Sequence, residues 1–397
     1  MRHTASTTVA AITLAVCAGF GPASQRNVTP PALTIAEEWR VAPDAQNIRG
    51  AGVLAVTIDR RVVVAPLGGG GDLMEFDSTG KSLLWKMPVG GGRDQDIRSV
   101  QRVGFAGQTL WVSDRGFDQV ALVDAHGKVT KSLARPSFVH PSFADKRKYP
   151  VFGRFDMLGL YADGTWLVRP GDEHSLVDTP EFDSTQTYLV RMAESGTIDR
   201  TIARVPADPV VSLRAPGRNA QFPVPFANRA LWAVSSDGMR VATVVAALRG
   251  KDSATYRVTT VNERGDTMFA KVFAFTPQVV SKAMRDSAVA NAGRFYNSGT
   301  FPNWRAEAEK RSESILTPVT AVLVGRDRTT WLLLRSAPAD SLTRTWSVLD
   351  PRGEPVARVT MPRDVVIFAA DLEHVWSIDK HGNDVRGIVR YKLVPAR

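Results

Sequence analysis

One pattern of strands and turns returns about six times along this sequence. Its clearest copy runs from Leu110-Trp111-Val112-Ser113-Asp114 through Gln119-Val120-Ala121-Leu122-Val123 to the turn Asp124-Ala125-His126-Gly127. Apolar and polar residues alternate at period two, which predicts half-buried strands, and Asp-x-x-Gly supplies residues that bend tightly. A repeat of roughly 40 to 50 residues with four strands cannot bury both of its faces alone, so the copies must pack against one another.

The repeats predict an all-β chain, a single six-bladed β-propeller of four-stranded antiparallel blades over residues 33–397. The approximate blades are residues 49–88, 98–135, 154–205, 229–276, 317–361 and 363–393. The last has material for only three strands, while residues 33–41 have strand character ahead of the first repeat. We therefore expect this N-terminal strand to complete the last blade and close the ring, which removes an exposed strand edge.

A small helical insertion is predicted between the fourth and fifth blades, over residues 277–316. Val279, Val280, Ala283 and Met284 recur at helical spacing, and residues 306–311 favour a helix. Such an insertion lies on one face of the ring, either as a passive surface or, near Trp304, as a docking point for another envelope protein. The stretches 136–150, 170–184 and 206–225 are rich in proline and charge and are expected to be loops.

Residues 1–25 have the form of a secretory signal peptide, with Arg2 and His3, an apolar stretch over 9–20 and a small-residue exit. This predicts an exported protein, periplasmic or extracellular. Cys17, the only cysteine, lies inside this segment, so the mature chain is expected to form no internal disulfide. Val16 departs from a lipoprotein box, so lipid anchoring through Cys17 is not expected. No other segment reaches the roughly 20 apolar residues of a membrane span, and we expect a monomer.

The formal net charge of +10 favours anionic partners. Export argues against nucleic acid as the partner. Acidic sugars, carboxylated or phosphorylated ligands and anionic headgroups remain open, as does an arginine-rich composition with no partner.

Several phrases resemble the six-bladed, NHL-like propeller proteins of secreted bacterial chains. These are residues 110–114, Phe-Asp-Ser-Thr-Gly-Lys at 76–81, the Gly-Gly-Gly-Arg turn at 90–93 and the closing Val-Arg-Tyr-Lys-Leu at 389–393. The resemblance covers the chain from Leu33 to its end and implies blade architecture. It implies little about function, because the same scaffold carries enzymes, scaffolds and binding proteins.

Two enzymatic relatives offer a test of catalysis. Gluconolactonase-type propellers use a metal-binding Glu within Glu-Gly-Pro, whereas Glu37-Glu38 is followed by Trp39. Amidating-lyase propellers use several histidines on a metal; the histidines after the signal segment are scattered, at His126, His140, His174, His374 and His381. No nucleophile elbow or His-Glu-x-x-His occurs. No cofactor is predicted, and a metal-assisted hydrolase or lyase with a divalent metal is the alternative to a binding or interaction module.

One arginine precedes the first turn of nearly every blade, at Arg49, Arg98, Arg154, Arg229 and Arg363. The fifth blade has Pro318 or Val319 there instead. These positions start the innermost strands, so the hypothesis is a ring of guanidinium groups at the channel mouth that binds an anionic small molecule, a peptide terminus or an acidic sugar. A one-residue shift along a strand turns a side chain to the opposite face of the sheet. The alternative is therefore that these arginines form structural ion pairs with Asp96, Asp156 and Asp364.

Overall fold

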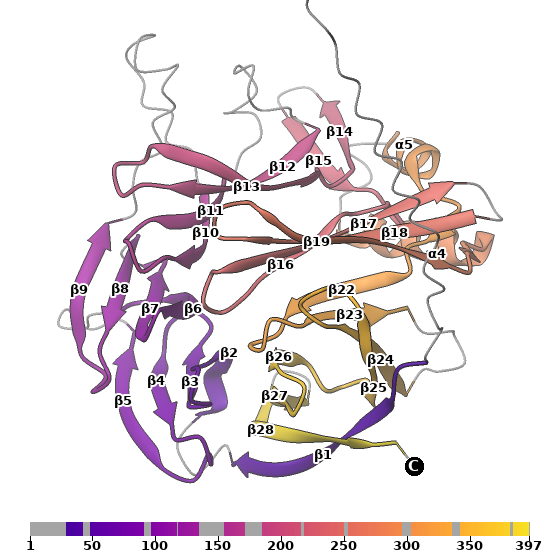
Figure 1. Cartoon of the computed structure of the whole chain (residues 1–397). Coiled ribbons are helices and arrows are strands. Elements are labelled where there is room, and N and C mark those ends of the chain that lie inside the picture. Colours follow the sequence, from indigo (N-terminus) through magenta and orange to yellow (C-terminus); the bar gives the residue numbers. More distant parts are fainter. Residues whose placement is uncertain are drawn as a thin grey trace, which may run out of the picture.

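The computed structural model describes residues 29–42, 48–90, 97–116, 118–134, 155–170, 185–215, 218–249, 253–295, 303–335, 342–381 and 384–396. Four separate four-stranded antiparallel sheets follow one another around a ring (Figure 1). Sheet 1 contains β2 (Ala51–Val56), β3 (Val62–Pro66), β4 (Gly71–Phe76) and β5 (Leu83–Val89). Sheet 2 contains β6 (Val100–Ala106), β7 (Thr109–Asp114), β8 (Gln119–Val123) and β9 (Val129–Ala134).

Sheets 3 and 4 continue the ring in the same strand order. Sheet 3 contains β10 (Phe155–Leu160), β11 (Trp166–Pro170), β12 (Gln186–Met192) and β13 (Ile198–Pro206). Sheet 4 contains β16 (Leu231–Val234), β17 (Arg240–Arg249), β18 (Ser253–Asn262) and β19 (Thr267–Phe275). First strands meet at the centre, since β2 contacts β6, β6 contacts β10, and β16 contacts β22 of the next sheet. This is the arrangement of a β-propeller, as the repeats predicted.

The remaining strands form one continuous sheet, here called the closing sheet. Its eight strands run in the order β22-β23-β24-β25-β1-β28-β27-β26. Their bounds are β22 (Val319–Val324), β23 (Thr330–Leu334), β24 (Thr343–Leu349), β25 (Pro355–Pro362), β1 (Ala32–Val41), β28 (Asp384–Pro395), β27 (His374–His381) and β26 (Ile367–Ala370). The predicted pairing of the N-terminal strand with the last repeat is present, because β1 runs antiparallel to β28.

The prediction of six separate blades needs a correction. The described residues form four separate blades and the closing sheet, because β1 also pairs in parallel with β25, from Ala32 opposite Arg358 to Thr34 opposite Thr360. The hydroxyl of Thr34 donates to the Thr360 carbonyl at 3.1 Å. A strand that satisfies both of its edges leaves no gap at which two sheets could separate.

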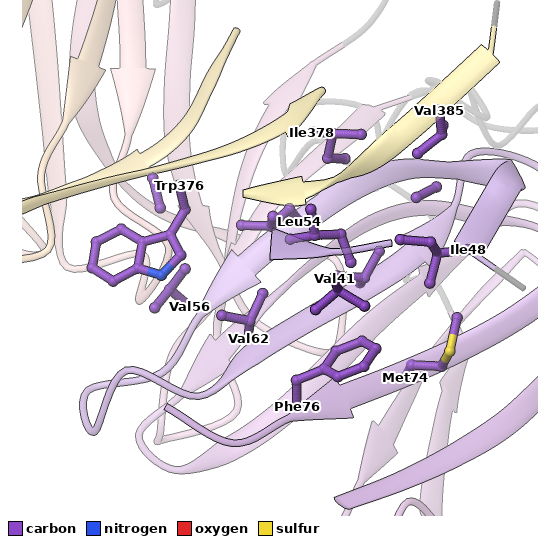
Figure 2. Packing of buried hydrophobic residues seen from close by; sticks show 14 residues of the cluster. Val41, Ile48, Leu54, Val56, Val62, Met74, Phe76, Trp376, Ile378 and Val385 are labelled. Carbon is purple, nitrogen blue, oxygen red and sulfur yellow. The ribbon is translucent and has the colours of Figure 1, made fainter. Parts of the chain in front are cut away.

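The core lies between facing sheets. The largest fully buried side chains include four tryptophans that share a place on the second strand of a sheet or of the closing sheet, namely Trp111, Trp166, Trp331 and Trp376. Figure 2 shows the joint between the first and last repeats, where Trp376 and Ile378 of β27 face Val56, Val62 and Phe76 of sheet 1. Trp111, Trp166 and Trp376 belong to clusters that join two sheets, whereas the cluster around Trp331 lies within the closing sheet. Truncation of a buried Trp to Ala costs about 3 to 5 kcal/mol.

A second contact joins neighbouring sheets at the Asp-x-x-Gly turns. Three of these glycines have a positive φ and lie against an aromatic ring of the neighbouring sheet: Gly127 against Trp85 of β5 and Gly353 against Phe269 of β19, each on the last strand of its sheet, and Gly80 against Trp39 of β1 in the closing sheet. A β-carbon on Gly127 would stand 2.5 Å from the Trp85 ring. The turn motif of the sequence is therefore also the contact that packs one sheet on the next.

Additional elements lie between the sheets. The hairpin of β14 (Val210–Ala215) and β15 (Arg218–Pro223) precedes sheet 4, and β20 (Gln278–Val279), α4 (Lys282–Phe295), α5 (Trp304–Arg311) and β21 (Ile315–Leu316) follow it. The single 3-10 helix of the described residues, η1 (Ile48–Gly50), precedes β2. Val279 belongs to β20, so the expected helical spacing begins too early, because α4 starts only at Lys282.

The expectation of a loop over 206–225 was wrong, since β14 and β15 occupy most of it. Phe222 of this hairpin packs edge-on against Trp304 at 6.1 Å, and Val211 joins the same small cluster. Hydrophobic residues placed far apart in sequence supplied the burial that stabilises the hairpin. Trp304 is 4% exposed, so it is not available as a docking residue.

Residues 1–28, with Cys17, and the expected loops at 136–150 and 171–184 lie outside the described residues. Within the described ranges, no helix has the length and apolar character to cross a bilayer.

Candidate functional site

The turns between the first and second strands of the sheets share one backbone design. Four of them carry an aspartate followed by a residue in the left-handed region, at Arg60 (φ 67°), Gly164 (φ 82°), Gly238 (φ 72°) and Arg328 (φ 71°). The aspartate caps the turn; Asp237, for example, accepts a hydrogen bond from the Met239 amide at 3.0 Å. These aspartates therefore fix the local geometry of the turns.

These first turns surround a pocket of about 550 Å³ at the end of the ring where the first strands finish. Sheets 1 to 4 and β22–β23 of the closing sheet all contribute to it. We call it the first-turn pocket; its lining includes Val56, Ile58, Asp59, Arg61, Phe105, Ala162, Asp237, Met239, Arg240, Arg326 and Arg328. Its volume is within the range of small-molecule binding sites.

Two sets of hydrogen bonds connect the walls of the pocket. The Phe105 amide of β6 donates to the Ser236 carbonyl at 3.0 Å, so a turn of sheet 4 reaches past sheet 3 to sheet 2. Arg326 donates to the carbonyls of Thr57 and Ile58 at 2.6 and 2.8 Å and to the Asp371 carboxylate at 2.9 Å. The pocket walls are therefore fixed to one another before any ligand arrives.

Four arginines and two aspartates line the pocket, and two of these arginines are neutralised within the fold. Arg61 pairs with Asp59 and with the buried Glu75, each at 2.8 Å. Arg326 pairs with Asp371, and both side chains of this pair are 8% exposed. The positive charge offered to a ligand therefore comes from the other two arginines.

Arg240, the first residue of β17, is the decisive side chain. It is 9% exposed, and its buried Nη1 has no hydrogen-bond partner among the described residues. Burial, together with the nearby charge of Arg328, lowers the pKa of Arg240, and attraction from Asp237 and Glu263 opposes this. A guanidinium stays protonated at neutral pH, so Arg240 presents a desolvated positive charge to the pocket.

Arg328 lies in the turn between β22 and β23 and is exposed. Its left-handed backbone is strained for a residue with a β-carbon, and glycine occupies the matching position in the turns of sheets 3 and 4. Arg60, the other arginine in this conformation, is held by ion pairs to Glu373 and Asp371. Arg328 has no ion pair within the described residues. Strain without a structural pairing points to a role in binding.

The described members of the predicted arginine series lie at the other end of the ring. Arg98, Arg229 and Arg363 precede β6, β16 and β26 and are exposed; Arg49 is in η1, and Arg154 and the side chain of Arg49 lie outside what the structure describes. Asp156, suggested as a structural partner, pairs with Arg169. Arg98, Arg229 and Arg363 therefore do not line the first-turn pocket, and the role of the series in binding stays a prediction.

The residues of the alternative metal site are dispersed. His126 is exposed, His374 is buried and His381 ends β27, while His140 and His174 lie outside the described ranges. Among the residues the structure describes, no group of three or more His, Cys, Asp or Glu side chains is placed to hold a metal ion.

Arg240 and Arg328 were not predicted, because the predicted arginine series precedes the first strands, whereas Arg328 lies within a first turn and Arg240 directly follows one. The signal was present in the turn itself, where Arg328 follows Asp327 at the position that glycine occupies after Asp163 and Asp237. Only the ring geometry brings Arg240 and Arg328, from different repeats, into one pocket.

Comparisons with known proteins add little to this picture. No family model and no curated protein match the sequence, so the NHL-like resemblance is not confirmed. Among solved structures, a DUF4221 family member from Bacteroides vulgatus matches with 9% identity and a TM-score of 0.48, over 92% of this chain and 100% of that chain. BamB from Moraxella catarrhalis matches with 10% identity and a TM-score of 0.30, over 86% and 84%. Similarities of this size support no inference about function.

Proposed function

We propose that this chain is a binding module that takes up an anionic ligand in the first-turn pocket. The observation that carries the proposal is the buried guanidinium of Arg240, which lines a pocket of about 550 Å³ and whose Nη1 has no hydrogen-bond partner among the described residues. Burying a charge costs free energy unless an opposite charge or hydrogen bonds compensate it. A bound anion would supply both for Arg240, and it would also offset the repulsion between Arg240 and Arg328.

The same proposal treats the molecule as a six-bladed, NHL-like ring, with the closing sheet as two blades joined along β25 and β1. Two observations support it: β26 contacts β2 and β22 as a first strand does, and Gly80 of sheet 1 packs on Trp39 of β1. Residues 277–316 are then an insertion between blades, and residues 1–25 direct export.

The arginines that precede the first strands offer a second place for an anion, at the opposite mouth. Arg98, Arg229 and Arg363 are exposed there. Exposed charges are hydrated and screened, so each of them would contribute less to binding than a desolvated guanidinium.

Anion-dependent stabilisation of the folded protein tests the proposal. The thermal midpoint is measured with increasing acetate, benzoate and phosphate at constant ionic strength, for the wild type, Arg240→Leu, Arg240→Lys and Arg98→Leu. A ligand that binds only the folded state raises the midpoint. We expect stabilisation in the wild type and Arg98→Leu, a partial effect in Arg240→Lys and none in Arg240→Leu.

Loss of the effect in Arg98→Leu alone would move the anion site to the opposite mouth. No anion-dependent stabilisation of the wild type would overturn the proposal. Far-ultraviolet circular dichroism of Arg240→Leu shows whether this variant keeps its strands.

A further inference from the structure

We infer that the ligand of the first-turn pocket is a singly charged carboxylate attached to an apolar body. This inference rests on the proposed function and adds the chemical class of the ligand. It is carried by Arg240 and Arg328, the pocket arginines that form no ion pair within the described residues, and by the apolar side chains around them.

The charge balance favours one negative charge on the ligand. Arg61 is paired with Asp59 and Glu75, and Arg326 is paired with Asp371. Arg240 and Arg328 remain; Asp237 of the same pocket attracts Arg240, as does Glu263, which is not part of the pocket lining. Counted with Glu75 and Asp371, the four arginines of the pocket face four carboxylates, so the pocket carries no net surplus of charge and its positive potential is local to Arg240 and Arg328. Such a local positive site suits a ligand with a single negative charge. A doubly charged phosphate would meet Asp237 with a charge in excess of what the arginines balance.

A planar carboxylate suits the donors that are offered. A guanidinium presents its N–H groups in a fixed fork, and a carboxylate accepts two of them side by side. Within the part of the chain that the structure describes, Nη1 of Arg240 is a buried donor without a hydrogen-bond partner. The ligand carboxylate would therefore lie against Arg240, with Arg328 at the rim of the pocket.

The apolar part of the ligand has a surface prepared for it. Val56 and Phe105 are buried, at 2% and 6% exposure, and line the pocket from β2 and β6. Ile58 and Met239 line it as well, yet they are 80% and 39% exposed. Large apolar side chains around a charged group indicate a ligand that carries both kinds of surface, because removing apolar surface from water is favourable.

The experiment compares carboxylates of increasing chain length by isothermal titration calorimetry of the full folded chain. The probes are acetate, butanoate, hexanoate and octanoate, with octanol and octyltrimethylammonium as uncharged and cationic controls. Each buried methylene should tighten binding about fourfold. We expect affinity to rise along the carboxylate series and neither control to compete with octanoate.

Two rim variants separate the apolar contribution from the charge. Ile58→Ser and Met239→Ser should flatten the chain-length dependence and leave butanoate binding unchanged within about twofold. Leu84→Ser is the matched control, since Leu84 is 46% exposed and outside the pocket lining; its chain-length dependence should equal that of the wild type. Both rim residues are exposed enough that the fold should tolerate serine.

The outcomes distinguish the two proposals. Equal affinity for acetate and octanoate, both lost in Arg240→Leu, would overturn the carboxylate-with-apolar-body inference while the anion site stands. Tighter binding of phosphate than of octanoate would also overturn it. Octanol binding as tightly as octanoate would show that the charge is not recognised and would overturn both. No binding of any anion would overturn both as well.

Discussion

Glycines in the Asp-x-x-Gly turns show how a single residue joins two sheets. Gly127 must adopt a φ of 75° to make its turn, and its missing β-carbon leaves the space in which the Trp85 ring lies. Gly164 has a similar φ of 82°, but nothing lies within 4 Å of the place where its β-carbon would be. Comparing the two glycines therefore separates the free-energy cost of a left-handed backbone with a β-carbon from the cost of disturbing the contact with the Trp85 ring.

We predict that Gly164→Ala lowers the free energy of unfolding by about 1 to 2 kcal/mol, because only the left-handed backbone is strained. Gly127→Ala should cost a further 1 to 3 kcal/mol or so, because the new methyl group overpacks the Trp85 ring. Urea unfolding followed by circular dichroism measures the difference. Equal midpoints for the two variants would contradict the inter-sheet role of the turn.

We expect Arg328 to lower the stability of the fold and to contribute to ligand binding. We predict that Arg328→Gly raises the free energy of unfolding by about 0.5 to 1 kcal/mol, because glycine removes the left-handed strain at a small entropic cost. The same change should weaken octanoate binding, because one of the two uncompensated charges is lost. Arg60→Gly is the comparison: it relieves the same strain but loses the ion pairs to Glu373 and Asp371, so little net stabilisation is expected.

At the scale of elements, the contact between β1 and β27 depends on a bulge. The register between β1 and β28 shifts between Glu37 and Trp39, so Glu38 stands at the irregularity. Its carboxylate accepts a hydrogen bond from Arg390 at 2.7 Å and lies 3.3 Å from Nε2 of the buried His374. The groups around His374 are Glu38 of β1, Asp371 and Glu373 of the turn before β27, Arg390 of β28 and Arg60 of the turn between β2 and β3.

Burial lowers the pKa of His374, and attraction from Asp371 opposes this shift. The unfolded state therefore takes up the proton first, so the free energy of unfolding falls as pH drops below about 6.5, until the folded-state pKa is reached. We predict a falling urea midpoint between pH 7.5 and 5.5. His374→Gln should reduce that fall, and His126→Gln, at an exposed site, should not. An unchanged fall in His374→Gln would refute this assignment.

Elements were predictable where the sequence carries its own period or turn chemistry. The repeats at 49–88 and 98–135 contain sheets 1 and 2 because alternation and Asp-x-x-Gly turns are local signals. The hairpin of β14 and β15 was missed because its stability comes from Trp304, far along the chain. The parallel contact of β1 with β25 was missed because alternation identifies a strand but not both of its neighbours.

On the scale of the whole molecule, β1 is the element that completes the ring. We predict that a chain lacking residues 1–41 unfolds at a lower urea concentration and with a broader transition, because β25, β28 and the Gly80 turn lose their partner. A labelled peptide of residues 31–42, added in trans, should bind this chain and restore the midpoint. Fluorescence anisotropy measures the binding, with a Trp39→Ala peptide as control. A deletion that leaves the midpoint unchanged would contradict the closing role of β1.

The candidate site illustrates the limit of sequence reasoning for a ring. The predicted anion site at a channel mouth stays a prediction, and the arginines that line the described pocket are Arg61, Arg240, Arg326 and Arg328, none of which belongs to the predicted series. Which mouth carries a pocket depends on how turns from different repeats meet, as when Ser236 accepts the Phe105 amide across sheet 3. Such contacts leave no periodic trace in the sequence.

The double pairing of β1 also sets how the molecule resists force. Leu33 lies opposite Pro395, so the start of β1 and the end of β28 are adjacent. Tension that draws these two strand ends apart would load the β1–β28 ladder in the unzipping geometry, in which the hydrogen bonds break one after another. Tension on the chain ahead of Ala32 against the far side of the ring would instead load the bonds to β25 and β28 lengthwise and together. The mechanical resistance of β1 is therefore low when its start is pulled away from β28 and high when the strand is pulled along its own axis.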